Sequence, residues 1–159
     1  MTVEMRLKQL GIELPPPPTL VANYVHAVKV GPLLFMSGNG PQKPDGMPVI
    51  GKLGGDLTVE QGYQAARLVG LRMLAAVREQ LGSLDRVKRL VRVTGMVNAT
   101  SDFAQQAKVI DGFSDLMVEV LGDNGRSARS APGMGSLPMQ VAVICDAIFE
   151  VEYVILCDI

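Results

Sequence analysis

A segment of small residues between Gly125 and Leu137 carries the arginine best suited to bind a ligand. Its sequence, GRSARSAPGMGSL, surrounds Arg129 with glycine, serine and alanine, and Leu137-Pro138 then precede a long apolar run. Small residues let main-chain N–H groups approach a ligand closely. A guanidinium in such a segment offers a planar fork for a carboxylate or phosphate. On composition alone the segment is typical of a surface loop with solvated arginines before a buried strand, and the alternative is an anion-binding loop.

The other polar residues that could do chemistry indicate neither a metal nor a cofactor. His26 is the only histidine, so the usual pair of imidazole ligands is missing. Asp111, Asp115 and Glu119 recur at every fourth position, as in a metal-binding row or a solvated helix face, and we expect the solvated face. The glycine-rich stretch 39–57 fits neither a dinucleotide fingerprint nor a phosphate loop. It predicts an irregular loop that could form a cleft wall.

Composition excludes several classes of protein. The chain has 159 residues, of which 48% are hydrophobic, and this favours one globular domain with a substantial core. Its 15 Lys and Arg residues against 16 Asp and Glu give a net charge of −1. Binding to a nucleic-acid backbone needs a basic surface. We therefore expect no nucleic-acid partner.

The cysteines and the N-terminus predict a cytoplasmic protein. Cys145 and Cys157 lie in apolar, strand-like sequence without CxxC spacing, which is typical of buried thiols in a reducing compartment. The first residues, MTVEMRLKQLG, lack the long apolar core of a secretory signal. No run approaches the ~18 apolar residues that a membrane-spanning helix needs. We expect no membrane partner.

The sequence divides into an N-terminal arm, residues 1–22, and a single domain, residues 23–159. Residues 2–10 predict a short helix that Gly11 ends. The four consecutive prolines Pro15–Pro18 predict an extended, semi-rigid segment. We interpret this segment as a spacer that lays the arm along the surface of the domain.

Apolar periodicity places the remaining elements. Thr58 and Gln61 form a capping box, and Arg67, Arg72 and Arg78 mark the wetter side of the helix that follows. The predicted elements are strands over 23–30 and 33–38, a helix over 59–81, a strand over 86–98, a helix over 103–121 capped by Ser101-Asp102 with Ala107 and Ile110 on its apolar side, a short strand around Arg129, and a strand over 141–156.

This β-β-α-β-α-β order predicts an α+β fold, a two-layer sandwich in which two helices cover one face of a mixed sheet. One face of the strand over 141–156 is wholly apolar and should pack on the helices. The other face alternates Ile144 and Ile148 with Asp146 and Glu150. A mixed face of this kind often lies against another subunit, so the sequence predicts an oligomer.

Three short motifs carry a family resemblance. Ser37-Gly38 end the second strand, Ala128-Arg129-Ser130 follow much later, and Leu137 comes eight residues after Arg129. Their order and spacing resemble the RidA family, also called the YjgF family, whose older name is endoribonuclease L-PSP. The resemblance covers about residues 23–148. The opening LGIELPPPP, ANY and GPLLFMSG are similar to a RidA-like branch that carries an N-terminal arm.

The resemblance implies a chorismate-mutase-like fold and a homotrimer with clefts between its subunits. Founding members hydrolyse reactive enamines and imines, such as 2-aminoacrylate, to 2-keto acids and ammonia without a metal or cofactor. For this chain, the resemblance implies that Arg129 is the catalytic residue that pairs with the substrate carboxylate. It implies that Gly38 and Ala131 present main-chain groups near that carboxylate, and that Tyr24 lines the cleft from an adjacent subunit.

Four positions depart from the family pattern. The family has a water-placing Glu in the final strand, and Ile144 stands there in this chain. An aliphatic side chain neither accepts a proton nor forms a hydrogen bond. Asp146 lies on the same face but about 6.5–7 Å further along the strand. The remaining departures are Asn39 for a Gln, Ala107 for an Asn, and Pro132 for a hydrophobic residue.

These observations leave two main hypotheses about function. In the first, the protein binds small carboxylates in clefts between subunits and hydrolyses enamine or imine intermediates. In the second, it is a non-catalytic binding or regulatory module that keeps Arg129 and has lost the water-placing Glu. Ribonuclease activity, which the older family name suggests, fits less well with the net charge of −1 and the single histidine.

Overall fold

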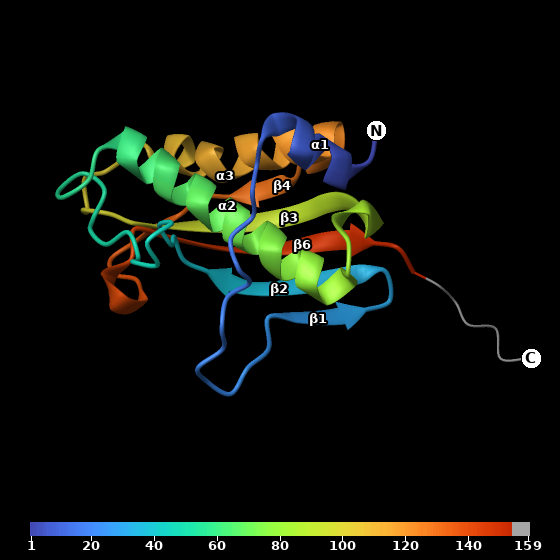
Figure 1. Ribbon diagram of the computed structural model, residues 1–159. Helices are drawn as coiled ribbons and strands as arrows, with labels where there is room; N and C mark the ends of the chain where they lie inside the picture. Colours follow the sequence, from blue (N-terminus) through green and yellow to red (C-terminus); the bar gives the residue numbers. More distant parts are fainter. Residues whose placement is uncertain (154–159) are drawn as a thin grey trace, which may run out of the picture.

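The computed structural model describes residues 1–153, in which helices and strands form two layers (Figure 1). The elements in chain order are α1 (Val3–Leu10), β1 (Ala27–Val30), β2 (Leu33–Asn39), α2 (Val59–Leu81), η1 (Leu84–Arg86), β3 (Val87–Asn98), α3 (Gln106–Leu121), η2 (Gly122–Gly125), β4 (Ala128–Ser130), β5 (Gly133–Met134), η3 (Pro138–Gln140) and β6 (Val143–Val151), where η marks a short 3₁₀ turn.

One six-stranded mixed sheet organises the fold. Its strand order is β1-β2-β6-β3-β4, and the short β5 also pairs with β3. The pairs β1–β2, β2–β6 and β3–β6 are antiparallel, whereas β4 and β5 run parallel to β3. Helices α2 and α3 lie side by side on one face of this sheet (Figure 1). The α+β two-layer sandwich expected from the sequence is confirmed.

Helix α2 follows the sequence prediction closely because its ends are chemically marked. The Thr58 hydroxyl accepts from the Gln61 N–H at 3.2 Å, and the Gln61 side chain accepts from the Thr58 N–H at 2.9 Å. Gly82 ends the helix in the left-handed conformation, with a φ of 80°. The apolar side of α2 is buried against the sheet and α3: Ala66, Val69, Met73, Ala76, Val77 and Leu81.

The predicted start of the second long helix is wrong. Helix α3 begins at Gln106, and its N-cap residue Gln105 makes no capping hydrogen bond with its side chain. Asp102, the expected cap, instead accepts a hydrogen bond from the Thr100 hydroxyl at 2.8 Å. Short polar side chains stabilise turns as readily as helix ends, and here the turn prevails. Ala107, expected on the apolar side, is exposed.

The strands are shorter than predicted at two places. β1 begins at Ala27, and the residues before it are irregular, with bends at Asn23 and His26. β6 runs from Val143 to Val151, so the prediction is wrong for residues 141–142 and 152–153. The predicted continuation over 154–156 lies outside the described residues, as does Cys157. The short strand expected around Arg129 is confirmed as β4.

The two faces of β6 divide as predicted. Alternate residues from Val143 to Val151 are buried under the helices, and both Cys145 and Phe149 are 0% exposed. The intervening residues, from Ile144 to Glu150, are partly exposed on the opposite face. Burial raises the pKa of the Cys145 thiol well above its ordinary value, so this cysteine is a core residue.

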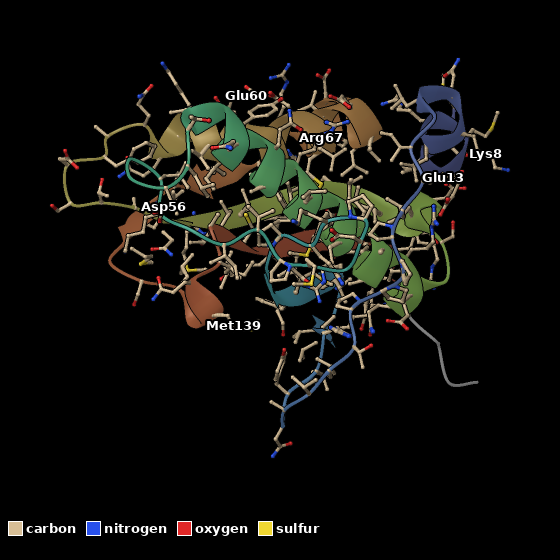
Figure 2. The ribbon with its side chains drawn as sticks, turned by 60° about the vertical axis from the view of Figure 1, so that its left-hand side comes forward. Lys8, Glu13, Asp56, Glu60, Arg67 and Met139 are labelled. Atoms are coloured by element: carbon tan, nitrogen blue, oxygen red, sulfur yellow. The ribbon has the colours of Figure 1, made fainter. Side chains whose placement is uncertain are left out.

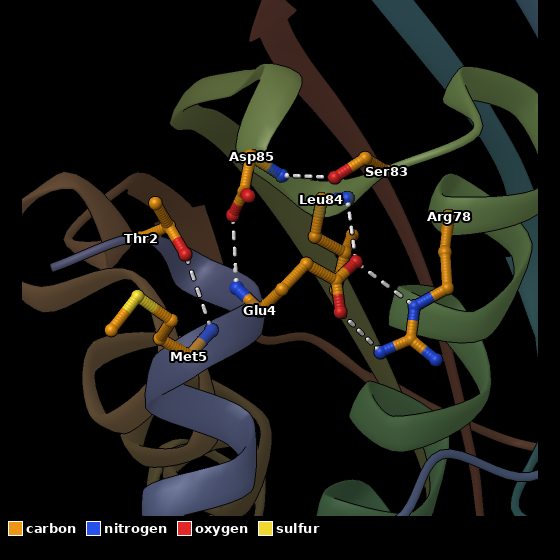
Figure 3. A network of polar contacts seen from close by, with 7 residues as sticks. All are labelled: Thr2, Glu4, Met5, Arg78, Ser83, Leu84 and Asp85. Atoms are coloured by element: carbon orange, nitrogen blue, oxygen red, sulfur yellow. Dashed lines mark hydrogen bonds and ion pairs between the residues drawn. The ribbon is translucent and has the colours of Figure 1, made fainter.

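The N-terminal arm is anchored to the domain at its first helix. Leu7 of α1 is 2% exposed and belongs to the main hydrophobic core. The Glu4 carboxylate accepts from Arg78 Nε and Nη2, at 3.1 and 2.7 Å, and from the Leu84 N–H at 3.0 Å (Figure 3). The Glu4 N–H donates to Asp85 at 2.9 Å. These bonds fix α1 to the end of α2 and to η1.

After α1 the chain crosses the outer side of α2 on its way to β1 (Figure 1). The prolines Pro15–Pro18 face Leu68 and Leu71 of α2 across a shallow hollow. Within residues 1–153, none of the helices has both the length and the apolar character needed to cross a membrane.

Candidate functional site

A cavity of about 360 Å³ lies at the end of β2, where the arm, the glycine-rich loop, α2 and η3 meet. Tyr24, Gly38 and Ile144, which come from three separate segments, all line it. Tyr24 and Gly38 are two of the residues that the sequence marked for binding, and Ile144 stands where the resembled family has its glutamate. The remaining wall comes from Pro18-Thr19, His26, residues 39–42, Gly46, Pro48, Arg72, Pro138-Met139 and Val141.

An irregularity in β2 brings the backbone of Gly38 close to Ile144. The register of β2 on β6 shifts between Met36 and Asn39. A Cβ atom on Gly38 would lie 3.0 Å from Cγ2 of Ile144, so this position favours glycine. Bulges of this type re-aim the chain beside functional sites. The next side chain, Asn39, is buried and donates to the Ser37 carbonyl at 3.1 Å.

Tyr24 and His26 are held in the cavity wall by β2. The Ser37 hydroxyl donates to the Val25 carbonyl at 2.6 Å, and the Ser37 N–H donates to the His26 carbonyl at 2.8 Å. These two bonds fasten the segment that precedes β1. Tyr24 lines the cavity and is half exposed.

The η3 turn closes one end of the cavity with a strained backbone. Met139 and Gln140 have φ values of 54° and 56°, a region that costs non-glycine residues about 1–3 kcal/mol each. Neighbouring bonds hold the turn in place, since the Gln140 carbonyl accepts from the Gly51 N–H at 2.9 Å and its side chain accepts from Asn98 at 3.2 Å. The Met139 side chain is exposed at the tip of the turn (Figure 2).

Arg72 is the only side chain with a permanent charge in the wall of this cavity, and no Asp or Glu of residues 1–153 lines it. Its Nη1 donates to the Gly40 carbonyl at 3.5 Å, and its buried Nε has no hydrogen-bond partner among residues 1–153. Burial lowers the pKa of its guanidinium from the ordinary value. Helical periodicity placed Arg72 with the solvated Arg67 and Arg78, so no sequence signal distinguished it.

Arg129 lies elsewhere. It projects from the edge strand β4 toward α3, where its Nη1 donates to Asp111 at 2.8 Å and to the Ser114 hydroxyl at 3.1 Å. Its side chain is 25% exposed. Ala131 follows β4 and packs partly against the core. The structure therefore brings Tyr24 and Gly38 together but places Arg129 and Ala131 at the far edge of the same sheet.

The acidic row of α3 joins helices and sheet. Asp115 accepts from the Tyr63 hydroxyl at 2.7 Å, and this bond raises the pKa of Tyr63 to about 12. Glu119 accepts from both terminal nitrogens of Arg67 at 2.9 and 3.1 Å, and Asp111 pairs with Arg129. Within residues 1–153, no group of three or more His, Cys, Asp and Glu side chains is arranged to hold a metal ion.

Comparison with known proteins places this fold in a family. Residues 4–151 match the family described as "YjgF/chorismate mutase-like, putative endoribonuclease". Protein TCP17 of Trypanosoma cruzi is 41% identical over 151 residues, which cover 94% of each chain. A solved structure from Shewanella oneidensis, described as a "putative endoribonuclease", is 33% identical with a TM-score of 0.90, over 95% of this chain and 100% of that one.

A more distant solved structure shares the fold. It is Escherichia coli TdcF with bound serine, 23% identical with a TM-score of 0.60, over 86% of this chain and 94% of that one. The family match spans residues 4–151, a range that includes nearly all of α1 and the motifs at Gly38, Arg129 and Leu137-Pro138. The chain therefore belongs to the YjgF/chorismate mutase-like family, the RidA family that its sequence resembles.

Proposed function

We propose that this protein binds small carboxylates in clefts between the subunits of a homotrimer. In this proposal each cleft combines the cavity of one copy with the Arg129 edge of the next copy. Arg129 pairs with the carboxylate, main-chain groups at Gly38 and Ala131 flank it, and Tyr24 closes the side. The proposed ligands are 2-keto acids and the imino acids related to them.

The observation that carries the proposal is the distribution of these residues over the sheet. Tyr24 and Gly38 line a cavity at the end of β2, whereas Arg129 lies on β4. The strand order places β6 and β3 between β2 and β4, a separation of about 14 Å at ordinary strand spacing. Within one chain, Arg129 therefore lies too far from Tyr24 and Gly38 to share a ligand with them. A second copy of the chain is the simplest source of an Arg129 beside this cavity.

The uncovered face of the sheet supports the assembly. Val28 pairs with Phe35, which pairs with Ile148, in a row of apolar side chains across three strands. Val28 is 52% exposed and Phe35 is 40% exposed. A contiguous apolar row on a sheet face is typical of a surface that another subunit covers.

The bonds of Arg129 suit a carboxylate anchor. Asp111 and Ser114 both engage Nη1, and this fixes the plane of the guanidinium. Nε and Nη2 make no hydrogen bond with the described residues, and they form the edge that binds a carboxylate through two parallel bonds. Prior orientation by a neighbouring carboxylate and hydroxyl lowers the entropic cost of binding.

Hydrolysis of enamines or imines is the second candidate, and His26 in the cavity wall is the observation that favours it. A histidine near neutral pH transfers protons readily. The position of the family's Glu is occupied by Ile144, which offers no proton acceptor. Binding without hydrolysis is accordingly the function that the geometry supports best.

Titration with 2-oxobutyrate tests the binding proposal. Arg129→Ala should weaken binding about 10- to 100-fold, because a charge-assisted bidentate pair is lost. Arg126→Ala is the matched control, since Arg126 lies three residues earlier and its side chain is 71% exposed. It should leave the affinity unchanged. Equal affinities for wild type and Arg129→Ala would refute the role of Arg129.

A coupled assay decides between binding and hydrolysis. A threonine or serine dehydratase supplies the reactive enamine, and formation of the 2-keto acid is followed with and without the protein. We expect no acceleration from the wild type. An acceleration that disappears in His26→Gln and in Arg129→Ala would establish the deaminase instead.

A further inference from the structure

We propose that Arg72 binds a second anionic group of the ligand, so that the preferred ligands are dicarboxylic acids rather than monocarboxylic acids. This inference rests on the proposed function, which supplies the first carboxylate site at Arg129 of a neighbouring copy. Arg72, at the end of the cleft away from that Arg129, then determines the preference for dicarboxylic over monocarboxylic acids.

The bonding of Arg72 is incomplete in the chain alone. Within the described part of the chain its Nε is buried without a hydrogen-bond partner, and its one hydrogen bond, to the Gly40 carbonyl, is long at 3.5 Å. No carboxylate of residues 1–153 forms an ion pair with it. The arginines Arg67, Arg78 and Arg129 each pair with a carboxylate within the chain.

An unpaired, partly buried guanidinium is costly to the fold. Burial removes water from the charge, and the low pKa of this group relative to ordinary arginine reflects the same desolvation. Natural proteins keep such a group where a ligand completes its bonding. An anion in the cavity would supply the missing acceptor for Nε and an opposite charge for the guanidinium.

The position of Arg72 suits the far end of a short ligand. It reaches the cavity from α2, in the helix layer, whereas Ile144 lies on the opposite face of the sheet. Gly38, at the end of β2, approaches Ile144, and the carbonyl of Gly40, just after β2, accepts from Arg72. A volume of about 360 Å³ exceeds the needs of one carboxylate group and leaves room for a chain that joins two.

The N-terminal arm shields this end of the cavity. Pro18 and Thr19 line the cavity, and Arg72 also borders the hollow beneath Pro15–Pro18. Restricted access of water strengthens the attraction between a guanidinium and an anion. The arm thereby makes Arg72 a stronger anion-binding group than an arginine on an open helix face.

Calorimetric titrations with 2-oxoglutarate and 2-oxobutyrate test this inference. The two acids share the 2-oxo acid group and differ in the second carboxylate. We expect the wild type to bind 2-oxoglutarate at least about tenfold more tightly. Arg72→Gln should remove this preference by weakening the binding of 2-oxoglutarate much more than that of 2-oxobutyrate. Arg67→Gln is the control, because it removes the same charge from the same helix near the α2–α3 junction, outside the cavity (Figure 2).

A second variant and a stability measurement distinguish loss of ligand binding from misfolding of the Arg72→Gln variant. Arg72→Lys keeps the charge without the fork and should keep part of the preference for the diacid. Ligand-free Arg72→Gln should melt at the wild-type temperature or above it, because an unpaired buried charge is removed. A much lower melting temperature would assign Arg72 a structural role and contradict the inference.

The outcomes separate the inference from the proposed function. An unchanged diacid preference in Arg72→Gln, or equal wild-type affinities for the two acids, would overturn the role of Arg72. If Arg129→Ala leaves both affinities unchanged, the proposed function fails. A selective loss of diacid binding in Arg72→Gln would stand in that case, with the first carboxylate held by another group.

Discussion

Arg72 and Arg129 differ in how the chain satisfies their charge, and this difference defines their proposed roles. Arg129 is oriented by Asp111 and Ser114 and keeps one edge of its guanidinium available. Arg72 has a buried Nε without a partner in a cavity that no acidic residue lines within residues 1–153. Arg129 is therefore oriented to bind a carboxylate before the ligand arrives. The guanidinium of Arg72 lacks an opposite charge, which an anionic ligand would supply.

Tyr63 provides a prediction at the scale of one residue. Its hydrogen bond to Asp115 raises the pKa of the phenol to about 12 from an ordinary value of 10. The neutral phenol is therefore favoured in the folded protein, and its contribution to stability is complete below pH 10 and is lost as the pH rises through 12. Ultraviolet titration should show one of the three tyrosines ionising last, and Tyr63→Phe should remove that step.

Asp115→Asn should lower the pKa of Tyr63 toward its ordinary value, because the charged acceptor is lost. Asp123→Asn, at a side chain that is 97% exposed, is the control and should leave the titration as in wild type. Tyrosines that ionise together in the wild type would refute the assigned bond.

At the scale of the elements, helix α1 is an integral part of the core. Leu7 is 2% exposed, and Glu4 binds Arg78 and the Leu84 N–H. Leu7→Ala should lower the free energy of unfolding by about 2–4 kcal/mol, as is usual for a truncated buried leucine. Met5→Ala, on the same helix but 60% exposed, should change it by less than about 0.5 kcal/mol. Urea denaturation measures both, and similar values for the two variants would mean that α1 is not docked.

The elements show which sequence signals are sufficient. The bounds of α2 were predictable because Thr58 and Gln61 cap one end and Gly82 the other. The start of α3 was not, because Asp102 bonds within a turn and Gln105 makes no cap. Local chemistry determines a helix end only where no competing turn uses the same side chain.

The candidate site was predictable in part for a related reason. Tyr24, Gly38 and Arg129 stand in motifs with a fixed order along the chain. In the sequence, Arg72 and Arg67 occupy similar positions on the polar side of one helix. In the structure, Arg67 pairs with Glu119, whereas Arg72 lies beside the Gly40 loop and the N-terminal arm. Contacts between distant segments do not leave a periodic signal in the sequence.

At the scale of the whole molecule, the uncovered sheet face predicts self-association. Phe35→Lys would place a charge in the apolar row between Val28 and Ile148. Light scattering should show a trimer for the wild type and a smaller species for the variant. Glu79→Lys, on the exposed side of α2, is the control and should leave the trimer intact. A monomeric wild type would contradict the assembly.

In the proposed assembly, each binding site draws Tyr24 from one copy and Arg129 from another. Tyr24→Glu places a repelling charge at a half-exposed position of the cavity, and Arg129→Ala removes the anchor. Each variant alone should bind 2-oxobutyrate at least about tenfold more weakly than the wild type. Subunits of the two variants, mixed equally and assembled together, should recover about a quarter of the wild-type sites, because some clefts then pair an intact cavity with an intact Arg129. No recovery in mixed assemblies that are shown to form would contradict the shared site.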